Sequence, residues 1–156
     1  MLSQHYSCAY ISEDETAKEI FPDTYTNIEN YPDKVKIVES QLLKRTKEIY
    51  ASGESVVIDR INLGKEFIEE IKKAFEKHLI LKILWPSMET IIERDRRREA
   101  WTSGENAVKR FYREYEELKP VIGEKNYIDN SDHTPEETFE NLVAEMNGLG
   151  PRSDRS

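Results

Sequence analysis

The chain has 156 residues, the size of one ordinary domain, and it can bury a core without disulfides or metals. It is 35% charged, 37% hydrophobic and 10% aromatic, too apolar for a disordered segment, and its net charge of −8 argues against generic nucleic acid binding. The single cysteine, Cys8, cannot form an internal disulfide, and no run approaches the roughly 20 apolar residues of a membrane span. We therefore expect a soluble, cytoplasmic protein.

Short apolar runs alternate along the chain with longer segments of helical periodicity. The runs predict strands at 8–11, 55–58, 79–85 and 126–128. Apolar residues at three- and four-residue steps predict helices over 35–49, 67–75, 88–92, 108–118 and 134–146, the fourth closed by Pro120. Such alternation is typical of parallel βαβ units.

The expected fold is therefore α/β, a mostly parallel, doubly wound sheet with helices on both faces in three layers. We expect one domain over residues 1–146. The last residues, 147–156, contain two glycines, a proline and alternating charges, and predict a flexible tail.

Polar residues directly follow the first two apolar runs. Ligands bind such sheets beyond the carboxyl ends of the strands, so these positions are candidate site residues. Asp14 lies in the acidic turn after the first run, where it is either part of a helix cap or a catalytic carboxylate. Asp59 follows the second run and could hold Mg²⁺, and Asn62 could form a hydrogen bond to a ligand. Alternatively, both residues are there because aspartate and asparagine favour turns.

A basic segment follows the third run. Arg94 and Arg98 are four residues apart, so on a helix they would share one face and could both contact a phosphate group. Arginines that delocalise charge suit phosphoryl transfer, although a solvated helix face of Arg and Glu pairs is the alternative.

The stretch after the fourth run contains Asp129 and Asn130, which could line a nucleotide base pocket or form a turn before a capped helix. The three histidines stand in unrelated contexts without metal-ligand spacing, so they indicate no metal site. Cys8 lies inside a predicted strand and reads as a core residue.

The order of these motifs resembles the P-loop kinases of the polynucleotide kinase, gluconate kinase and chloramphenicol phosphotransferase kind, the AAA-like relatives of zeta toxins. The resemblance covers about residues 1–146, and its most specific parts are 56–63, 86–98, 111–115 and 127–131. It implies a three-layer P-loop kinase-like fold, with ATP and Mg²⁺ as cofactors.

The same resemblance implies roles for individual residues. Asp14 matches the carboxylate that activates the acceptor hydroxyl, and Asp59 the acidic residue at the tip of the Walker B-like strand, where it helps to hold Mg²⁺. Arg94 and Arg98 match the lid arginines. Polynucleotide kinases carry an arginine three residues beyond the catalytic aspartate, whereas this chain has Ala17, which weakens the case for a nucleic acid acceptor.

One motif of the family is missing. No G-x-x-x-x-G-K-[ST] loop, which holds the phosphates of ATP, occurs in the 156 residues. Residues 1–6 look like the end of the helix that should follow it, so we expect the first βα unit of the family fold to be absent. We expect a shortened form of a complete kinase, or a degenerate member with a rearranged sheet.

The function implied is an ATP-dependent phosphotransferase for a small hydroxylated molecule or nucleotide, which binds ATP poorly in this form. One alternative is a non-catalytic or regulatory domain that keeps the kinase fold. Another is a polynucleotide 5′-hydroxyl kinase, which the acidic surface and Ala17 disfavour.

Overall fold

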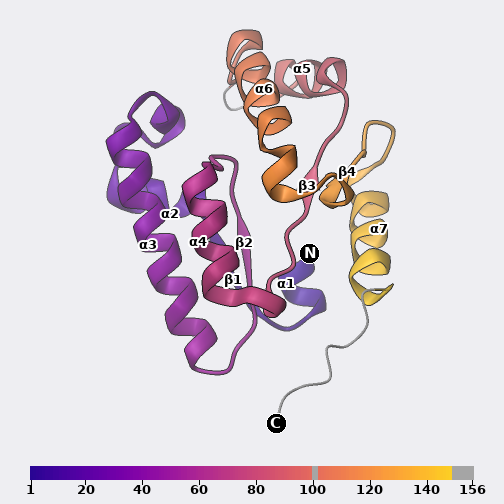
Figure 1. The fold of residues 1–156 in the computed structure, drawn as a ribbon. Coiled ribbons are helices and arrows are strands. Elements are labelled where there is room, and N and C mark those ends of the chain that lie inside the picture. The colour runs from indigo at the N-terminus through magenta and orange to yellow at the C-terminus, as the bar shows by residue number, and fades with distance from the viewer. Residues whose placement is uncertain (100–101, 149–156) are drawn as a thin grey trace. The chain divides into compact units, whose positions relative to one another are not determined.

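The computed structural model describes residues 1–99 and 102–148. The chain divides into two compact units, residues 1–74 and 75–156. Both units contain helices and a pair of parallel strands, so the prediction of an α/β protein is confirmed (Figure 1).

The first unit alternates helices and strands in the order that the sequence predicts. A short helix opens it, as expected for residues 1–6. Its elements are α1 (Leu2–His5), β1 (Ala9–Ser12), α2 (Glu13–Ile20), the 3₁₀ helix η1 (Tyr25–Asn30), α3 (Pro32–Ala51), β2 (Val56–Asp59) and α4 (Lys65–Phe75), whose last residue falls in the second unit.

Strands β1 and β2 pair in parallel, with Ala9 opposite Val56 and Ser12 opposite Asp59. Side chains alternate between the two faces of a sheet, so Ile11 and Val56 lie on one face while Tyr10 and Asp59 lie on the other. Ile11 is buried in a core with Ala17, Ile28, Val38 and Leu42, against which Val56 also packs.

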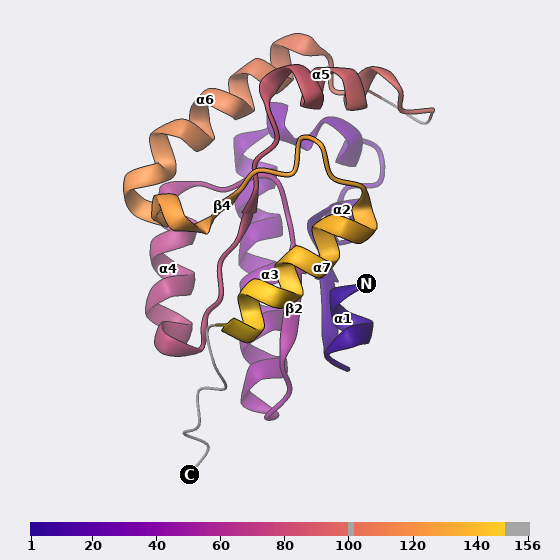
Figure 2. The same cartoon turned by 90° about the vertical axis from the view of Figure 1, so that its right-hand side faces the viewer.

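Helix α3 covers this face because its apolar residues recur at helical spacing. Val38, Leu42, Leu43 and Thr46 form its buried stripe. Helix α4 lies beside α3 in both ribbon views, and Lys47 of α3 pairs with Glu70 of α4 at 3.6 Å (Figures 1 and 2). The two helices thus support the strands whose carboxyl ends carry the candidate site.

The second unit contains shorter strands and a long helix. Its elements after the end of α4 are the 3₁₀ helix η2 (Glu76–His78), β3 (Ile83–Leu84), α5 (Met88–Arg96), α6 (Glu105–Ile122), the 3₁₀ helix η3 (Glu124–Asn126), β4 (Tyr127–Ile128) and α7 (Pro135–Gly148). Strands β3 and β4 pair in parallel, Ile83 opposite Tyr127 and Leu84 opposite Ile128.

Aromatic side chains pack together beside this strand pair. The Trp85 ring stacks on that of Tyr112 of α6 with centroids 4.1 Å apart, and Tyr127 meets Trp85 edge-on at 5.4 Å. The Tyr127 hydroxyl donates to the Tyr115 carbonyl at 2.6 Å, and burial, followed by the charge of Glu116, raises the pKa of that hydroxyl to about 12. The cluster therefore joins α6 to both strands of the unit.

Two elements differ from the predictions for a clear physical reason. The predicted strand 79–85 is only Ile83–Leu84, because β4 supplies just two paired residues. Pro120 does not close α6, which continues to Ile122 and stops at Gly123 with φ +94°. Proline in a last turn removes one backbone donor, whereas glycine at positive φ turns the chain out of the helix.

Helix α7 reaches Gly148, two residues past the predicted domain end, and the rest of the predicted tail, 149–156, lies outside the described residues. None of the helices in the described part of the chain is long and apolar enough to cross a membrane.

Candidate functional site

The carboxyl ends of β1 and β2 form the candidate site of the first unit. Ser12 caps α2, since its Oγ accepts from the Glu15 N–H at 3.3 Å, and its carbonyl accepts from Thr16 Oγ1 at 2.8 Å. The acidic turn after β1 is thus a helix N-terminus, as one of the two interpretations predicts. Asp14 lies in its first turn with its side chain exposed, so it is accessible to a ligand.

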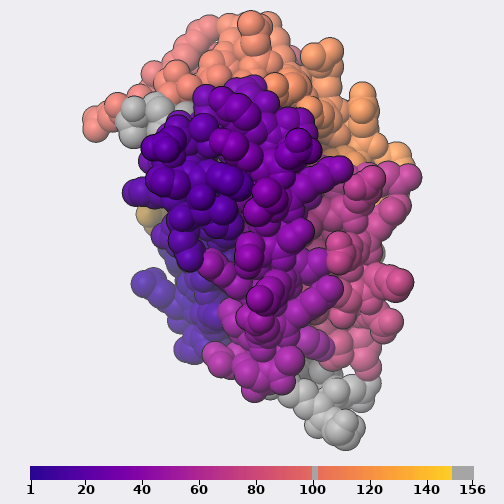
Figure 3. Space-filling model, turned by 90° about the vertical axis from the view of Figure 1, so that its left-hand side faces the viewer, coloured from indigo at the N-terminus to yellow at the C-terminus, as the bar shows by residue number. Residues whose placement is uncertain are grey.

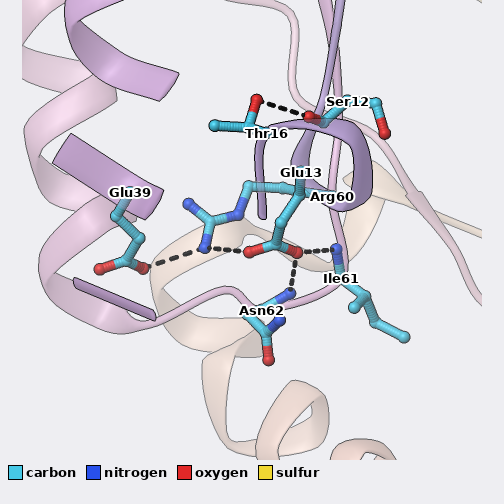
Figure 4. Close-up of polar contacts among 7 residues, drawn as sticks. All are labelled: Ser12, Glu13, Thr16, Glu39, Arg60, Ile61 and Asn62. Atoms are coloured by element: carbon cyan, nitrogen blue, oxygen red, sulfur yellow. Dashed lines mark hydrogen bonds and ion pairs between the residues drawn. The ribbon is translucent and has the colours of Figure 1, made fainter. Parts of the chain in front are cut away.

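Glu13, beside Asp14, is buried instead and only 2% exposed. Its Oε2 accepts from the backbone N–H groups of Ile61 and Asn62, each at 3.0 Å, and its Oε1 accepts from Arg60 Nη2 at 3.0 Å (Figure 4). One carboxylate from the turn after β1 therefore fixes the turn after β2.

Arg60 occupies the centre of this network. Its Nη2 also donates to Glu39 of α3 at 3.0 Å (Figure 4). Its guanidinium lies 3.9 Å from the centre of the Phe67 ring of α4. The Arg60 side chain is 4% exposed, and its Nε and Nη1 have no hydrogen-bond partner among the described residues. The face of the Phe67 ring offsets part of the lost hydration of the cation.

Glu39 shares the arginine with Glu13. Burial raises the pKa of the Glu39 carboxyl above its ordinary value, while the positive charge of Arg60 acts in the opposite direction. Two carboxylates facing one guanidinium leave an excess negative charge in a poorly hydrated place, so the charged form of Glu39 is less stable there than in water.

Asp59 has a different environment on the opposite face of the strand pair. Its side chain is exposed, and its Oδ2 accepts from the Tyr10 hydroxyl at 3.1 Å. Burial, followed by the charge of Asp59, raises the pKa of the Tyr10 hydroxyl. The hydroxyl therefore keeps its proton and can donate it to Asp59 in a hydrogen bond. The Asn62 backbone is held by Glu13, and its side chain is half-buried.

The expected cofactors can be tested against these groups. Mg²⁺ in phosphoryl-transfer sites is held by one or two carboxylates together with substrate phosphates, rather than by a cage of protein ligands. The exposed carboxylate of Asp59 suits this arrangement. Within residues 1–99 and 102–148 no group of three histidine, cysteine, aspartate or glutamate side chains could hold a metal ion alone.

The arginines of the second unit do not lie as predicted. Helix α5 ends at Arg96, so Arg98 lies beyond it, and the expectation that Arg94 and Arg98 share one helical face is wrong. Asp95 provides the physical reason. Its buried carboxylate accepts from the backbone N–H groups of Ser103 and Gly104, each at 2.9 Å, and so connects the end of α5 to the start of α6.

Arg94 contacts the turn after β4. Its Nη2 donates to the carbonyls of Asn130 at 2.9 Å, Ser131 at 3.1 Å and His133 at 3.3 Å. Arg98 lies with Nη1 4.0 Å from Asp95 Oδ1, and its side chain is 55% exposed. The described contacts of Arg94 are thus those of a residue that shapes a turn.

Asp129 and Asn130 also take part in this turn. The Asp129 carboxylate accepts from the N–H and hydroxyl of Ser131, which holds its pKa below the ordinary range. Asn130 is buried and donates weakly to Thr138 Oγ1 at 3.4 Å, while its Oδ1 has no hydrogen-bond partner in the described part of the chain. Thr134 and Glu137 then form a reciprocal capping box for α7, as the sequence predicts.

The predicted site residues therefore form two groups. The first unit brings together the carboxyl ends that carry Asp14, Asp59 and Asn62. The second unit brings Arg94 to the backbone beside Asp129 and Asn130. A nucleotide role for Asp129 and Asn130 and a lid role for the arginines stay predictions.

Sequence reasoning missed Glu13, Arg60 and Glu39, although one signal was present. Glu39 falls on the apolar stripe of α3, one residue after Val38 and three before Leu42. A charged residue on a buried stripe requires a partner of opposite sign. That partner is Arg60, which the pairing of β1 with β2 brings to Glu39. The composition of either strand does not show how the two strands align.

Comparisons with known proteins do not assign the chain to a family. No protein-family model matches it, and no curated protein matches it significantly.

Proposed function

We propose that the chain is an ATP-dependent phosphotransferase with a P-loop kinase-like three-layer fold. Its acceptor is a small hydroxylated molecule or nucleotide. One observation carries this proposal. Because Ser12 lies opposite Asp59 in the parallel register, the turn with Asp14 and the strand tip with Asp59 emerge at the same edge of the strand pair. Ligands of such sheets bind at this edge.

The two aspartates have separable roles. Asp14, exposed in the first turn of α2, accepts the proton of the acceptor hydroxyl as general base. Asp59, exposed at the end of β2, holds Mg²⁺ directly or through water, and the Tyr10 hydroxyl orients its carboxylate. Bound Mg·ATP supplies the phosphoryl group and leaves as the diphosphate. Glu13 and Arg60 hold the intervening turns in place.

Arg94 and Arg98 are proposed to stabilise the negative charge of the transferred group, and Asp129 with Asn130 to contact the nucleotide. In this proposal the three bonds from Arg94 to the turn after β4 couple the arginine to the segment that meets the nucleotide.

The acceptor we favour is a small molecule rather than a nucleic acid end. Ala17 occupies the position where polynucleotide kinases carry an arginine, and it is 0% exposed in the core of the first unit. An arginine side chain has no room at such a position, so the chain lacks that contact to a terminal phosphate.

A mass-spectrometric screen tests the proposal. The 156-residue chain and the longest product of its gene are each incubated with Mg²⁺, ATP and a panel of sugars, sugar acids, nucleosides and 5′-hydroxyl oligonucleotides. We expect a phosphorylated small molecule, and Asp14→Asn lowers kcat roughly 10²- to 10⁴-fold because the general base is lost. Asp23→Asn, the same change at an exposed aspartate outside the site, leaves kcat unchanged.

The absence of a phosphate-binding G-x-x-x-x-G-K-[ST] sequence from the 156 residues favours a second candidate, a non-catalytic domain with a kinase-like fold. If neither length of chain transfers phosphate to any member of the panel while both are folded by circular dichroism, the kinase proposal fails and this candidate replaces it. Transfer that Asp14→Asn does not reduce would overturn the assignment of the base.

A further inference from the structure

Strand β1 has one open edge. Ala9 donates its N–H to the Ser55 carbonyl at 3.0 Å, on the side of β2. Backbone groups of successive residues in a parallel strand point to opposite edges, so the N–H and C=O of Tyr10 point away from β2. The described residues contain no other strand paired with β1. An unpaired edge of this kind is a template for an added strand.

A groove of about 320 Å³ lies along β1 and between α2 and α3. Its lining residues are Tyr10, Ile11, Ser12, Glu15, Thr16, Glu19, Arg45, Glu48 and Ile49. Figure 3 views the face where the indigo N-terminal segments adjoin the purple helix α3. The strand thus borders a recess whose side walls are helices, rather than a flat surface.

The side walls of the groove carry unbalanced negative charge. Arg45 Nη2 donates to both oxygens of Glu19 at 2.9 Å, which neutralises the one cation among the lining residues. Glu15 and Glu48 have no ion pair within the described part of the chain, and both are exposed. Two uncompensated carboxylates at the walls favour an occupant that carries positive charge.

We propose that this groove, the β1 edge groove, binds an extended basic peptide segment of another protein by strand addition to β1. The edge supplies the N–H and C=O of Tyr10, so backbone pairing is short, and lysine or arginine side chains of the segment contact Glu15 and Glu48. A second copy of the chain fits less well because each copy has a net charge of −8.

Fluorescence anisotropy with labelled peptides tests the proposal. The probe is acetyl-Lys-Val-Lys-Val-Lys-amide, added to the 156-residue chain at low ionic strength. We expect saturable binding that weakens about tenfold or more when glutamate replaces lysine, because of like-charge repulsion. Methylation of the backbone nitrogens of the two valines should weaken binding at unchanged charge, since it removes the N–H that donates to the Tyr10 carbonyl.

Matched variants separate the groove from the net charge of the protein. Glu15→Gln with Glu48→Gln should weaken binding several-fold, whereas Glu117→Gln with Glu140→Gln, which are also exposed but lie in the second unit, should not. The proposal fails if the glutamate peptide or the methylated peptide binds as well as the probe, or if both double variants behave alike. Concentration-dependent dimerisation in sedimentation velocity, abolished by the probe, would replace the peptide with a second copy. None of these measurements requires ATP or activity.

Discussion

Arg60 binds two carboxylates and an aromatic ring while almost fully removed from water. Its partners come from three elements: Glu13 opens α2, Glu39 lies on α3 and Phe67 on α4. Bringing one cation and two anions out of water is expensive, and a pair of this kind is stabilising only while every member is present. The arginine is thus the residue on which the geometry of the turn after β2 depends most.

Replacing Arg60 with methionine is expected to be strongly destabilising. The change keeps much of the side-chain volume but leaves Glu13 and Glu39 facing each other without a cation, which we expect to lower the free energy of unfolding by about 3 kcal/mol. Urea denaturation measures it. Arg45→Met breaks an exposed pair and should cost less than about 1 kcal/mol. An equal effect of the two substitutions would contradict the central role of Arg60.

Glu39 should make the folded state less stable as the pH rises, whereas most carboxylates in folded proteins have the opposite effect. Burial raises the pKa of this carboxyl in the folded chain above its ordinary value of 4.5, so the folded state binds a proton more tightly than the unfolded state. The contribution is fully present below the unfolded pKa and is lost as the pH rises through the folded pKa.

Glu39→Gln removes that contribution, and the difference between the two stability curves isolates it. Urea denaturation of both proteins between about pH 4 and pH 7 is the measurement. We expect the wild type to lose stability relative to the variant as the pH rises. The lowered pKa values of Glu105, Asp129 and Glu137 act with the opposite sign and are common to both proteins. A parallel pair of curves would exclude the assigned effect.

At the residue scale, the sequence predicted where two carboxylates lie, whereas their chemical roles stay a prediction. Asp14 and Asp59 were chosen because they follow apolar runs, and both are exposed at the ends of adjacent strands. Glu13 was not singled out from the sequence. Its burial depends on the register that brings residues 60–62 within reach, a relation between segments almost fifty residues apart.

Elements whose ends are fixed by local signals were predicted closely, and those fixed by tertiary contacts were not. The capping box before α7 and the two strands of the first unit appear where expected. The end of α5 at Arg96 depends on Asp95, because its carboxylate accepts a hydrogen bond from the backbone N–H of Ser103, which lies beyond the helix. A charged run of helix formers contains no local sign of that stop.

Asp95→Ala should loosen the connection between α5 and α6. The substitution leaves the N–H groups of Ser103 and Gly104 without their acceptor, and we expect a loss of about 1–3 kcal/mol of stability. Hydrogen exchange should accelerate at those two amides. Asp132→Ala, at an exposed aspartate, is the control and should change neither quantity. Unaltered exchange at Ser103 and Gly104 in the first variant would mean that Asp95 does not hold them.

At the scale of the whole molecule, alternation of apolar runs and helical segments predicted the α/β class, which the structure confirms. The finer expectation of one doubly wound sheet stays a proposal, because the described strands form two parallel pairs, one in each unit. Strand order across a sheet is set by long-range pairing. A sequence pattern indicates which segments are strands but not which strands adjoin.

Net charge gives a prediction for the entire chain. With a charge of −8, the protein should not shift a 5′-hydroxyl oligonucleotide in a gel at moderate salt, because too few cations are available to displace counterions from the phosphates. Electrophoresis with a basic protein as positive control is the measurement. A retarded complex that persists as salt is raised would restore the polynucleotide kinase alternative.

The stacking of Trp85 on Tyr112 makes the protein its own spectroscopic probe. Both tryptophans of the chain come after residue 84, so the first unit contains none. Intrinsic fluorescence excited at the indole band therefore reports on the second unit, where Trp85 contacts three tyrosine rings. The segments that carry Asp14, Asp59 and the β1 edge groove emit no indole signal, and a tryptophan introduced there would give an uncontaminated reading of ligand binding.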